Sequence, residues 1–217
     1  MKLKCAIFDI DGVVIHTAKM HYNAWKKVFL KYGKNFTFDE FKKTIDGMPR
    51  DKGAKFIFPE FSKEKINIIC KEKQKYFNEI LKKEKAKVFY DAVKLIKHLR
   101  RNKIKIVIAS SSKNAVSILK KLNLYKLFDI DAKGAYVKKG KPHPDIFLKA
   151  AKKLKMKPEN CVVFEDSLNG VVAAKRAGMK CIAINRDRKS IKGADLIVKS
   201  FNNLKVNDIK KLFNKRD

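Results

Sequence analysis

The sequence has few acidic residues and very little arginine. Of its 217 residues, 53 are Lys or Arg and only 22 are Asp or Glu, and just seven of the basic residues are Arg. The formal net charge of +31 raises the question of nucleic-acid binding, because basic chains attract polyanions. Arg, however, dominates specific base recognition, and no basic run is interleaved with exposed aromatic residues. The lysines are spread along every helix-like segment, which favours a solvated surface over a specific nucleic-acid site.

Cysteine pairs and long apolar runs are missing too. The four cysteines form no Cys-x-x-Cys pair, which argues against a zinc site and against a disulfide framework. Cys5 and Cys161 could lie near each other on neighbouring strands. No run of eighteen apolar residues exists, and the N-terminus turns acidic at Asp9, where a signal peptide would need an apolar segment. We therefore expect a soluble, cytoplasmic protein without a membrane partner.

The chain has no internal repeat and no low-complexity linker, and its length suits one large domain or a core with a smaller insert. Residues 17–87 show helical periodicity and almost no β-branched runs. Apolar residues such as Trp25, Phe29 and Leu30 recur at three- and four-residue spacing there. This stretch is expected to be all-helical.

Strands and helices alternate in the remainder of the chain. The expected strands are 4–8, 105–110, 127–131, 161–166, 180–185 and 194–199, and the expected helices are 91–102, 112–122, 142–154, 167–178 and 206–216. Such alternation predicts right-handed βαβ units and a doubly wound, Rossmann-like parallel sheet. Because the helical block follows the first strand, we expect a cap domain at 16–87 inserted into a core formed by 1–15 and 88–217.

Polar residues stand where three of the expected strands end, and one lysine stands ahead of a helix. They are Asp9 and Asp11 before Gly12, then Ser110, Ser111 and Ser112, then Glu165 and Asp166, with Lys141 held by Pro142. In open α/β sheets, ligands bind beyond the carboxyl ends of the strands. These side chains are therefore expected to converge on one cleft.

Four carboxylates in one cleft need a counter-charge, because they could not all stay ionised without one. Oxygen ligands with room for water suit Mg²⁺. Helix-start amides, a Ser hydroxyl and a Lys suit a phosphoryl group. With that charge neutralised, Asp9 can attack a phosphate, and Asp11 can protonate the leaving oxygen and later activate the acceptor.

Each of these features has a simpler explanation when taken alone. An Asp-Gly turn after a strand is common, a serine run is usually a loop, and an acidic pair before a helix is usually an N-cap. Lys141 is one of many lysines. The combination, in this order and at the strand ends, is what favours a catalytic site.

The chain resembles the haloacid dehalogenase superfamily of phosphotransferases from Leu3 to about Leu212. Its four motifs are similar to "FDIDGVV", "VIASSS", "KGKPHPDIF" and "FEDSLNGVVAAKRAG". The resemblance implies that Asp9 is the phosphorylated nucleophile and Asp11 the general acid and base, and that Ser110 and Lys141 bind the transferred phosphate. It also implies a Mg²⁺ ion held by Asp9, the backbone carbonyl of Asp11, Glu165 and Asp166.

Within this superfamily the chain is most similar to the β-phosphoglucomutase branch, on the cap stretches "HYNAWKKVF", "DGMPRDKGA" and "KQKYF". The resemblance implies that His21 and Lys73 act in cap closure and that Arg50 clamps a distal phosphate. The remaining residues of that substrate site would be Ser111, Ser112, Lys113 and Asn114. Without the resemblance, His21 would be a helix residue packing beside Trp25, and Arg50 a surface cation.

Two positions depart from the branch: His16 stands where an acidic residue is usual, in the expected hinge, and Pro49 where Ser is frequent. Three functions stay open. The first is a sugar phosphomutase, and the second is a small sugar-phosphate phosphatase, because "DGMPR" resembles members labelled only as hydrolases. The third and most distant is a basic nucleic-acid-binding protein. We expect a monomer that acts on a small phosphorylated sugar or related metabolite.

Overall fold

The computed structural model describes residues 1–112, 114–131, 139–186 and 191–214. The chain divides into two compact units, the first comprising Met1–Ile15 with Val88–Asp217 and the second His16–Lys87. The chain passes between the units at two short strands, β2 (Ile15–His16) and β3 (Lys87–Val88), which pair with each other.

A parallel sheet forms the centre of the first unit. Its strand order is β5-β4-β1-β6-β7-β8 among the described residues, and all five pairings are parallel. The central strands are continuous apolar runs because both faces of the sheet are covered. The strands are β1 (Cys5–Phe8), β4 (Lys105–Ile108), β5 (Ile130–Asp131), β6 (Cys161–Glu165), β7 (Lys180–Ile184) and β8 (Leu196–Val198). This arrangement confirms the predicted doubly wound sheet.

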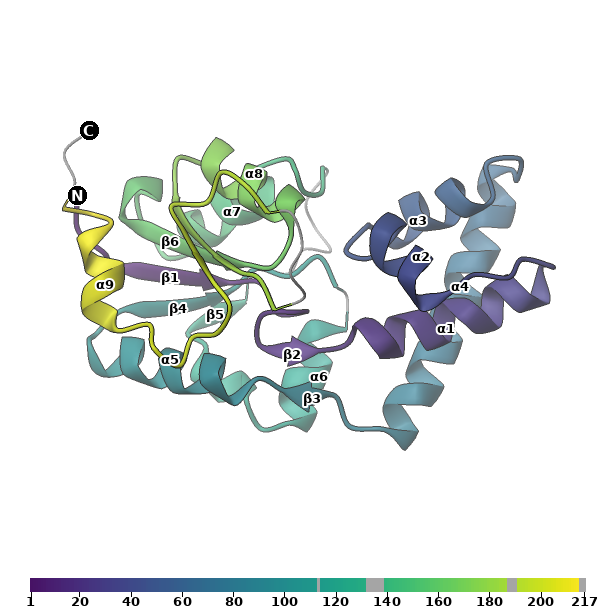
Figure 1. Cartoon of the computed structure of the whole chain (residues 1–217), viewed down its shortest axis with the longest axis horizontal. Helices are drawn as coiled ribbons and strands as arrows, with labels where there is room; N and C mark the ends of the chain where they lie inside the picture. Colours follow the sequence, from purple (N-terminus) through teal and green to yellow (C-terminus); the bar gives the residue numbers. More distant parts are fainter. Residues whose placement is uncertain (113, 132–138, 187–190, 215–217) are drawn as a thin grey trace. The chain divides into compact units, whose positions relative to one another are not determined.

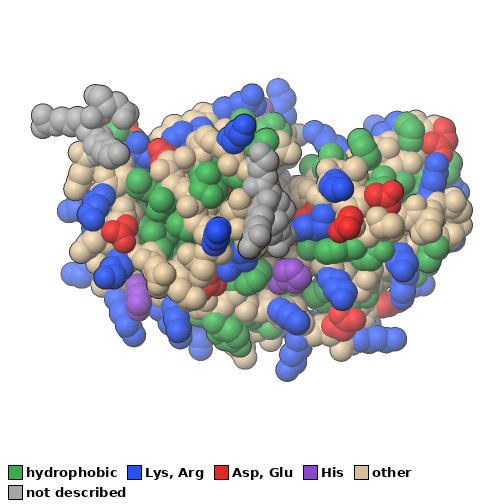
Figure 2. Space-filling model, in the orientation of Figure 1, with side chains coloured by type: hydrophobic (Ala, Val, Ile, Leu, Met, Phe, Trp, Pro, Cys, Tyr) green, Lys and Arg blue, Asp and Glu red, His purple; other side chains and the backbone are tan. Residues whose placement is uncertain are grey.

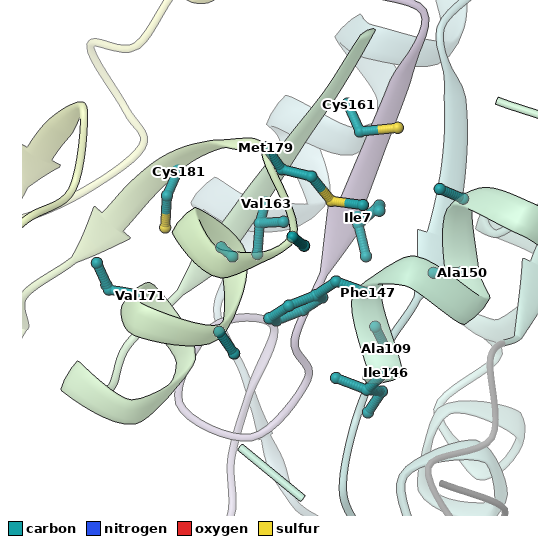
Figure 3. Close-up of a cluster of buried hydrophobic side chains, with 14 of the residues drawn as sticks. Ile7, Ala109, Ile146, Phe147, Ala150, Cys161, Val163, Val171, Met179 and Cys181 are labelled. Carbon is teal, nitrogen blue, oxygen red and sulfur yellow. The ribbon is translucent and has the colours of Figure 1, made fainter. Parts of the chain in front are cut away.

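Helices cover both faces of this sheet (Figure 1). On one face α7 and α8 bury a cluster that includes Ile7, Phe147 and Val163, shown in Figure 3. On the other, α5 packs against β4 and also contacts α9. The helices are α5 (Tyr90–Arg101), α6 (Ala115–Lys121), α7 (Asp145–Lys153), α8 (Leu168–Arg176) and α9 (Val206–Lys211).

The cysteines lie as the sequence suggested. Cys5 and Cys161 are in-register partners on β1 and β6, and both are fully buried. All four thiols are free. Burial also raises the pKa of Cys181. These buried thiols act as small apolar side chains.

Several elements are shorter than expected, among them α7, which begins at Asp145 and not at residue 142, and α9, which ends at Lys211. For two others the reason involves side chains. In the segment 127–131 the pairing with β4 begins only at Ile130. The reason is that the Ile106 N–H donates to the side-chain oxygen Asp129 Oδ2 (2.8 Å), and not to a backbone carbonyl of this segment. The helix expected at 112–122 begins at Ala115. Upstream of it, the N–H groups of Ser112 and Asn114 donate to serine hydroxyls (3.1 and 3.3 Å), which competes with helical hydrogen bonding.

Four helices build the second unit in its described residues, as the periodicity predicted. They are α1 (Ala18–Lys31), α2 (Phe38–Thr44), α3 (Arg50–Ile57) and α4 (Lys63–Lys83). Thr37 and Glu40 form a reciprocal capping box at the start of α2, and Ser62 caps α4. Their shared core is aromatic, with Trp25 stacked on Phe29 at a centroid distance of 5.3 Å.

Basic side chains are spread over the surface of both units. Figure 2 shows Lys and Arg across the whole visible face, with Asp and Glu between them. In the described part of the chain, no helix is both long and apolar enough to cross a membrane.

Candidate active site

The carboxyl ends of β1, β4 and β6 are adjacent, because β1 is hydrogen-bonded to both other strands. The pairing continues beyond each strand. The Asp9 N–H donates to the Phe164 carbonyl (3.0 Å), and the Ala109 N–H donates to the last carbonyl of β1 (2.8 Å). Asp9, Ser110 and Glu165 therefore leave the sheet at the same edge. This edge is where the sequence placed them.

Lys141 is the cation of this edge. Its Nζ donates to Asp9 Oδ1 at 2.7 Å and also to Glu165 Oε1. Little of these side chains is exposed: 11% for Lys141, 9% for Asp9 and 1% for Glu165. Burial alone would lower the pKa of Lys141, but the two carboxylates outweigh it and raise the pKa. The ammonium therefore stays charged between them.

The positive charge near Asp9 is too small to offset its burial and the neighbouring carboxylates. Burial, the largest influence, raises its pKa, Lys141 lowers it, and the carboxylates of Glu165, Asp11 and Asp166 raise it again. The result is a pKa well above the ordinary value of 3.8. One ammonium therefore does not balance this group of carboxylates, and a further cation would.

Glu165 is held rigidly by the start of α8. Its Oε2 accepts hydrogen bonds from the Asp166 N–H (3.0 Å), the Ser167 N–H (3.1 Å) and the Ser167 hydroxyl (2.9 Å). The same Ser167 oxygen accepts the Gly170 N–H (3.1 Å) and so caps α8. The other carboxylate oxygen of Glu165, Oε1, contacts Lys141. Glu165 thus has one orientation, fixed by the local chain.

Gly170 makes that orientation possible, since a Cβ at this position would lie 2.0 Å from the Glu165 carboxyl carbon. Neither Ser167 nor Gly170 was predicted as a site residue from the sequence. A signal for them was present: a Ser at the N-cap position followed three residues later by a glycine inside a helical pattern, which often marks a close approach.

Asp11 lies on the tight turn after β1. The Ser110 hydroxyl donates to Asp11 Oδ2 at 3.3 Å. Gly12 has a φ of 82°, and a Cβ there would meet Asp166 Oδ2 at 2.2 Å, so only glycine lets the Asp166 carboxylate approach the turn. The turn is closed by the Gly12 N–H, which donates to the Ile15 carbonyl (2.8 Å).

The donor set at this edge fits Mg²⁺ in its chemistry. The groups are carboxylate and backbone oxygens, and two glycines, which lack a Cβ, let the Glu165 and Asp166 carboxylates lie close to the chain. Mg²⁺ is usually held through one or two carboxylates and keeps several waters. Among the described residues, no three His, Cys, Asp or Glu side chains are arranged as direct ligands of one ion. In this structure the Lys141 ammonium lies between two of the carboxylates that would hold the ion, Asp9 and Glu165.

Two backbone amides ahead of α6, at the helix start that was expected to suit a phosphoryl group, already have partners in the serine loop. The Ser112 N–H donates to Ser110 Oγ and the Asn114 N–H to Ser112 Oγ. Ser111 is exposed and Asn114 is buried. Lys113 lies outside the described residues.

In the second unit, His21 and Lys73 are in direct contact. Lys73 Nζ is 2.7 Å from His21 Nδ1, and only 3% of Lys73 is exposed. The His21 ring stacks on Phe77 at 4.2 Å, and the ammonium lies over the rings of Phe77 (4.7 Å) and Trp25 (5.7 Å). The two residues that the resemblance singled out thus form one cluster, in which His21 stacks on Phe77 and Lys73 lies over Trp25.

Arg50 begins α3 and is held against α4. Its guanidinium donates to the Cys70 carbonyl (3.3 Å) and to the side chain of Gln74. Burial lowers the pKa of this Arg, although neighbouring groups oppose the change. Arg50 is therefore half-buried and ordered, unlike an ordinary surface cation.

Known proteins are similar to this chain in sequence. Residues 3–178 match the family described as haloacid dehalogenase-like hydrolase. The chain is 35% identical over 187 residues to a phosphorylated carbohydrates phosphatase of Thermotoga maritima. The aligned region covers 83% of this chain and 84% of the relative. It is 32% identical over 209 residues to a β-phosphoglucomutase of Bacillus subtilis, and this aligned region covers 93% of this chain and 92% of the relative.

A solved structure agrees with these sequence matches. The crystal structure of β-phosphoglucomutase from Clostridium difficile superposes with a TM-score of 0.90 at 32% identity, over 98% of this chain and 97% of that one. The chain therefore belongs to the haloacid dehalogenase-like hydrolase family, in its β-phosphoglucomutase-like branch, and is an enzyme of the phosphatase and phosphomutase type.

Proposed function

We propose that this enzyme is a Mg²⁺-dependent sugar phosphomutase, similar to β-phosphoglucomutase, that works through a phosphoaspartate on Asp9. The observation that carries the proposal is the buried bridge from Lys141 to Asp9 and Glu165 beside the Ser110–Asp11 pair. The names of the relatives support a phosphorylated sugar as substrate. In this proposal the first unit is the catalytic core and the second is the helical cap.

In the first step, an Asp9 carboxylate oxygen attacks the phosphorus of the substrate. A new O–P bond forms on Asp9 while the ester P–O bond breaks, and Asp11 gives its proton to the leaving sugar oxygen. Lys141 and the Ser110 hydroxyl offset the charge of the phosphoryl oxygens. Mg²⁺, when held by Asp9, the Asp11 carbonyl, Glu165 and Asp166, would neutralise the remaining charge.

In the second step, the phosphoryl group leaves Asp9 for an acceptor. Asp11, now a carboxylate, takes the proton of the attacking hydroxyl, and the Asp9–phosphorus bond breaks. A sugar hydroxyl as acceptor gives a phosphomutase, and water gives a phosphatase. The role of Asp11 is the same in both, so the acceptor decides the function.

The remaining residues are proposed to choose that acceptor. His21 and Lys73 would act in cap closure and keep water out until substrate is bound. Arg50 would bind the phosphate that is not being transferred, together with Ser111, Ser112, Lys113 and Asn114. A guanidinium can hold such a phosphate by two parallel hydrogen bonds.

A phosphatase that acts on small sugar phosphates is the second candidate. It is favoured by the 35% identity to a phosphorylated carbohydrates phosphatase. The deciding experiment incubates the enzyme with a panel of sugar monophosphates, with and without a trace of the matching sugar bisphosphate, and follows the products by phosphorus NMR. A new monophosphate isomer that needs the bisphosphate supports the mutase. Inorganic phosphate without an isomer supports the phosphatase, and no reaction with any ester rejects both.

The metal has its own test. The same assay in excess chelator should show no turnover, and added Mg²⁺ should restore it, because Asp9 lacks positive charge without a second cation. Full turnover in chelator would contradict the metal requirement while leaving the phosphoaspartate in place.

A further inference from the structure

Asp91, in the first turn of α5, is the centre of a buried hydrogen-bond network away from the catalytic carboxylates. Its Oδ2 accepts from the Ser200 hydroxyl (3.0 Å) and from the Phe201 N–H (2.8 Å). Both of its oxygens also accept from Arg186, at 2.9 and 3.0 Å. Only 8% of this side chain is exposed. Three distant segments of the first unit therefore meet at one carboxylate.

Arg186, which follows β7, also stacks its planar guanidinium on aromatic rings. Its guanidinium lies 3.9 Å from the centroid of the Phe89 ring and 5.6 Å from that of Phe201. Burial alone would raise the pKa of Asp91, but the hydrogen bonds from Arg186, Phe201 and Ser200 outweigh it and lower the pKa. The pair is thus bidentate, stacked and charged, which is the geometry that Lys cannot reproduce.

From this network an aromatic stack leads to the catalytic strands. The Phe201 ring meets Phe164 edge-on, with centroids 5.5 Å apart, and Phe164 stacks on Phe8 at 4.3 Å. Phe8 immediately precedes Asp9, and Phe164 immediately precedes Glu165. The aromatic side chains at the ends of β1 and β6 therefore pack against Phe201, whose backbone N–H donates to Asp91.

A second connection leads to the turn that carries Asp11. The Phe89 N–H donates to the Val14 carbonyl at 2.9 Å, and the Val14 N–H donates to the Ile10 carbonyl at 2.9 Å. Phe89 is the residue on which Arg186 stacks. The network thus contacts the turn of residues 9–15 through Phe89 and the β1–β6 pair through Phe201.

We propose that Asp91 and Arg186 are positioning residues for phosphoryl transfer, which fix the distance between Asp9, Asp11 and Glu165 without touching the substrate. The proposal rests on the proposed function. Its reason is geometric: displacements of about 1 Å at reacting groups can cost about a hundredfold in rate, so the support of these three carboxylates matters for the reaction.

Asp195 offers a matched control at the other edge of the sheet. It accepts from Lys175 Nζ (2.7 and 2.9 Å) and from the Cys181 N–H (2.8 Å), near the start of β7. It is also a partly buried carboxylate between cations and a backbone amide, with 15% exposed. Within the described part of the chain, the side-chain contacts of Asp195 are with Lys175, Lys180 and the Cys181 N–H, so it shares the chemistry of Asp91 but not its connections to the catalytic strands.

The experiment compares Asp91→Asn with Asp195→Asn in the full-length protein. Both variants should lose similar stability in urea unfolding. Only Asp91→Asn should lower kcat for phosphate-ester turnover, by about tenfold or more with KM within about twofold, because ground-state binding is not its role. Only Asp91→Asn should speed amide hydrogen exchange in residues 9–15, relative to wild type.

Hydrogen exchange separates this proposal from the proposed function, because it needs no turnover. If the wild type turns over no phosphate ester, the proposed function fails, and faster exchange at 9–15 in Asp91→Asn alone still supports the part of the proposal in which the network holds this turn in place. Equal exchange at 9–15 in both variants overturns it, as does an unchanged kcat in an active enzyme. If Asp91→Asn does not fold, Arg186→Lys is used in its place, because it keeps the charge and loses only the fork and the stacking.

Discussion

At the scale of single residues, Asp9 has charges of both signs around it. Lys141 donates to it, while three neighbouring carboxylates raise its pKa. A carboxylate nucleophile has to be ionised, so the reaction needs positive charge as much as it needs Asp9. A substitution that removes the charge and keeps the shape therefore isolates the role of this side chain.

Asp9→Asn should lower phosphate-ester turnover by about four orders of magnitude or more, because an amide cannot form the phosphoaspartate. Folding should stay intact, since Asn is nearly isosteric and the Lys141–Glu165 contact remains. The measurement is product formation over many enzyme equivalents, with the urea midpoint as the control. Multiple turnovers by this variant at a rate near that of the wild type would reject Asp9 as the nucleophile.

Asp195 makes stability depend on pH. Burial would raise its pKa, but Lys175, the Cys181 N–H and Lys180 outweigh it and lower the pKa below the ordinary 3.8. A lowered folded-state pKa stabilises the protein above the unfolded-state value, and this is lost as pH falls through the folded-state value. Wild type should therefore exceed Asp195→Asn in unfolding free energy at neutral pH. The difference should shrink below about pH 4, as followed by urea titrations at several pH values. A difference that stays constant down to pH 2 would contradict this.

At the scale of elements, the strands were the most predictable features. Runs such as residues 4–8 and 161–166 are apolar throughout because helices cover both faces of a parallel sheet. The segment 127–131 was predicted too long, since the Asp129 side chain takes the Ile106 N–H that a strand would have used. That replacement is a tertiary contact, and periodicity carries no information about it.

The convergence of the site could be predicted for a similar reason. Parallel strands bring their carboxyl ends to one edge, so Asp9, Ser110 and Glu165 could be placed together from order alone. How Glu165 is oriented could not, because it depends on the Ser167 hydroxyl and on the missing side chain at Gly170. Such close approaches follow from packing between elements.

Gly170→Ala tests that close approach. Alanine in place of glycine normally stabilises a helix by up to about 1 kcal/mol. Here the new methyl group would meet the Glu165 carboxylate, so we expect at least a tenfold loss of turnover and weaker Mg²⁺ binding by calorimetry. Gly53→Ala in α3 is the matched control, since its nearest neighbour would be Ile45 Cβ at an ordinary 3.5 Å. Equal activity of the two variants would show that Glu165 moves without consequence.

At the scale of the whole molecule, the large positive charge has no single location. The net charge of +31 comes mostly from lysines, and Figure 2 shows them over the whole visible face. That distribution agrees with a solvated surface, and long-range attraction to anionic substrates follows from it at low salt. The choice between phosphomutase and phosphatase therefore rests on particular residues.

A phosphomutase has to bind two phosphate groups at once. Its bisphosphate intermediate is released in one orientation and bound again in the other, so a site is needed for the phosphate that is not reacting. A phosphatase that acts on a monophosphate has less need of that second site. Arg50 is the residue proposed for it, and in this structure its guanidinium is already ordered by the Cys70 carbonyl and Gln74.

Arg50→Ala should therefore separate the two functions. Mutase turnover should fall by about a hundredfold, which corresponds to about 2.7 kcal/mol, whereas slow hydrolysis of acetyl phosphate should change little, because this small substrate has no second phosphate. Both rates are measured on the same preparation, with Gln74→Ala as the control that loosens the Arg50 side chain but keeps its charge. Equal losses in the two assays would show that Arg50 supports the fold of the second unit. The enzyme would then be better described as a phosphatase, since the guanidinium proposed to clamp a distal phosphate would have no part in binding it.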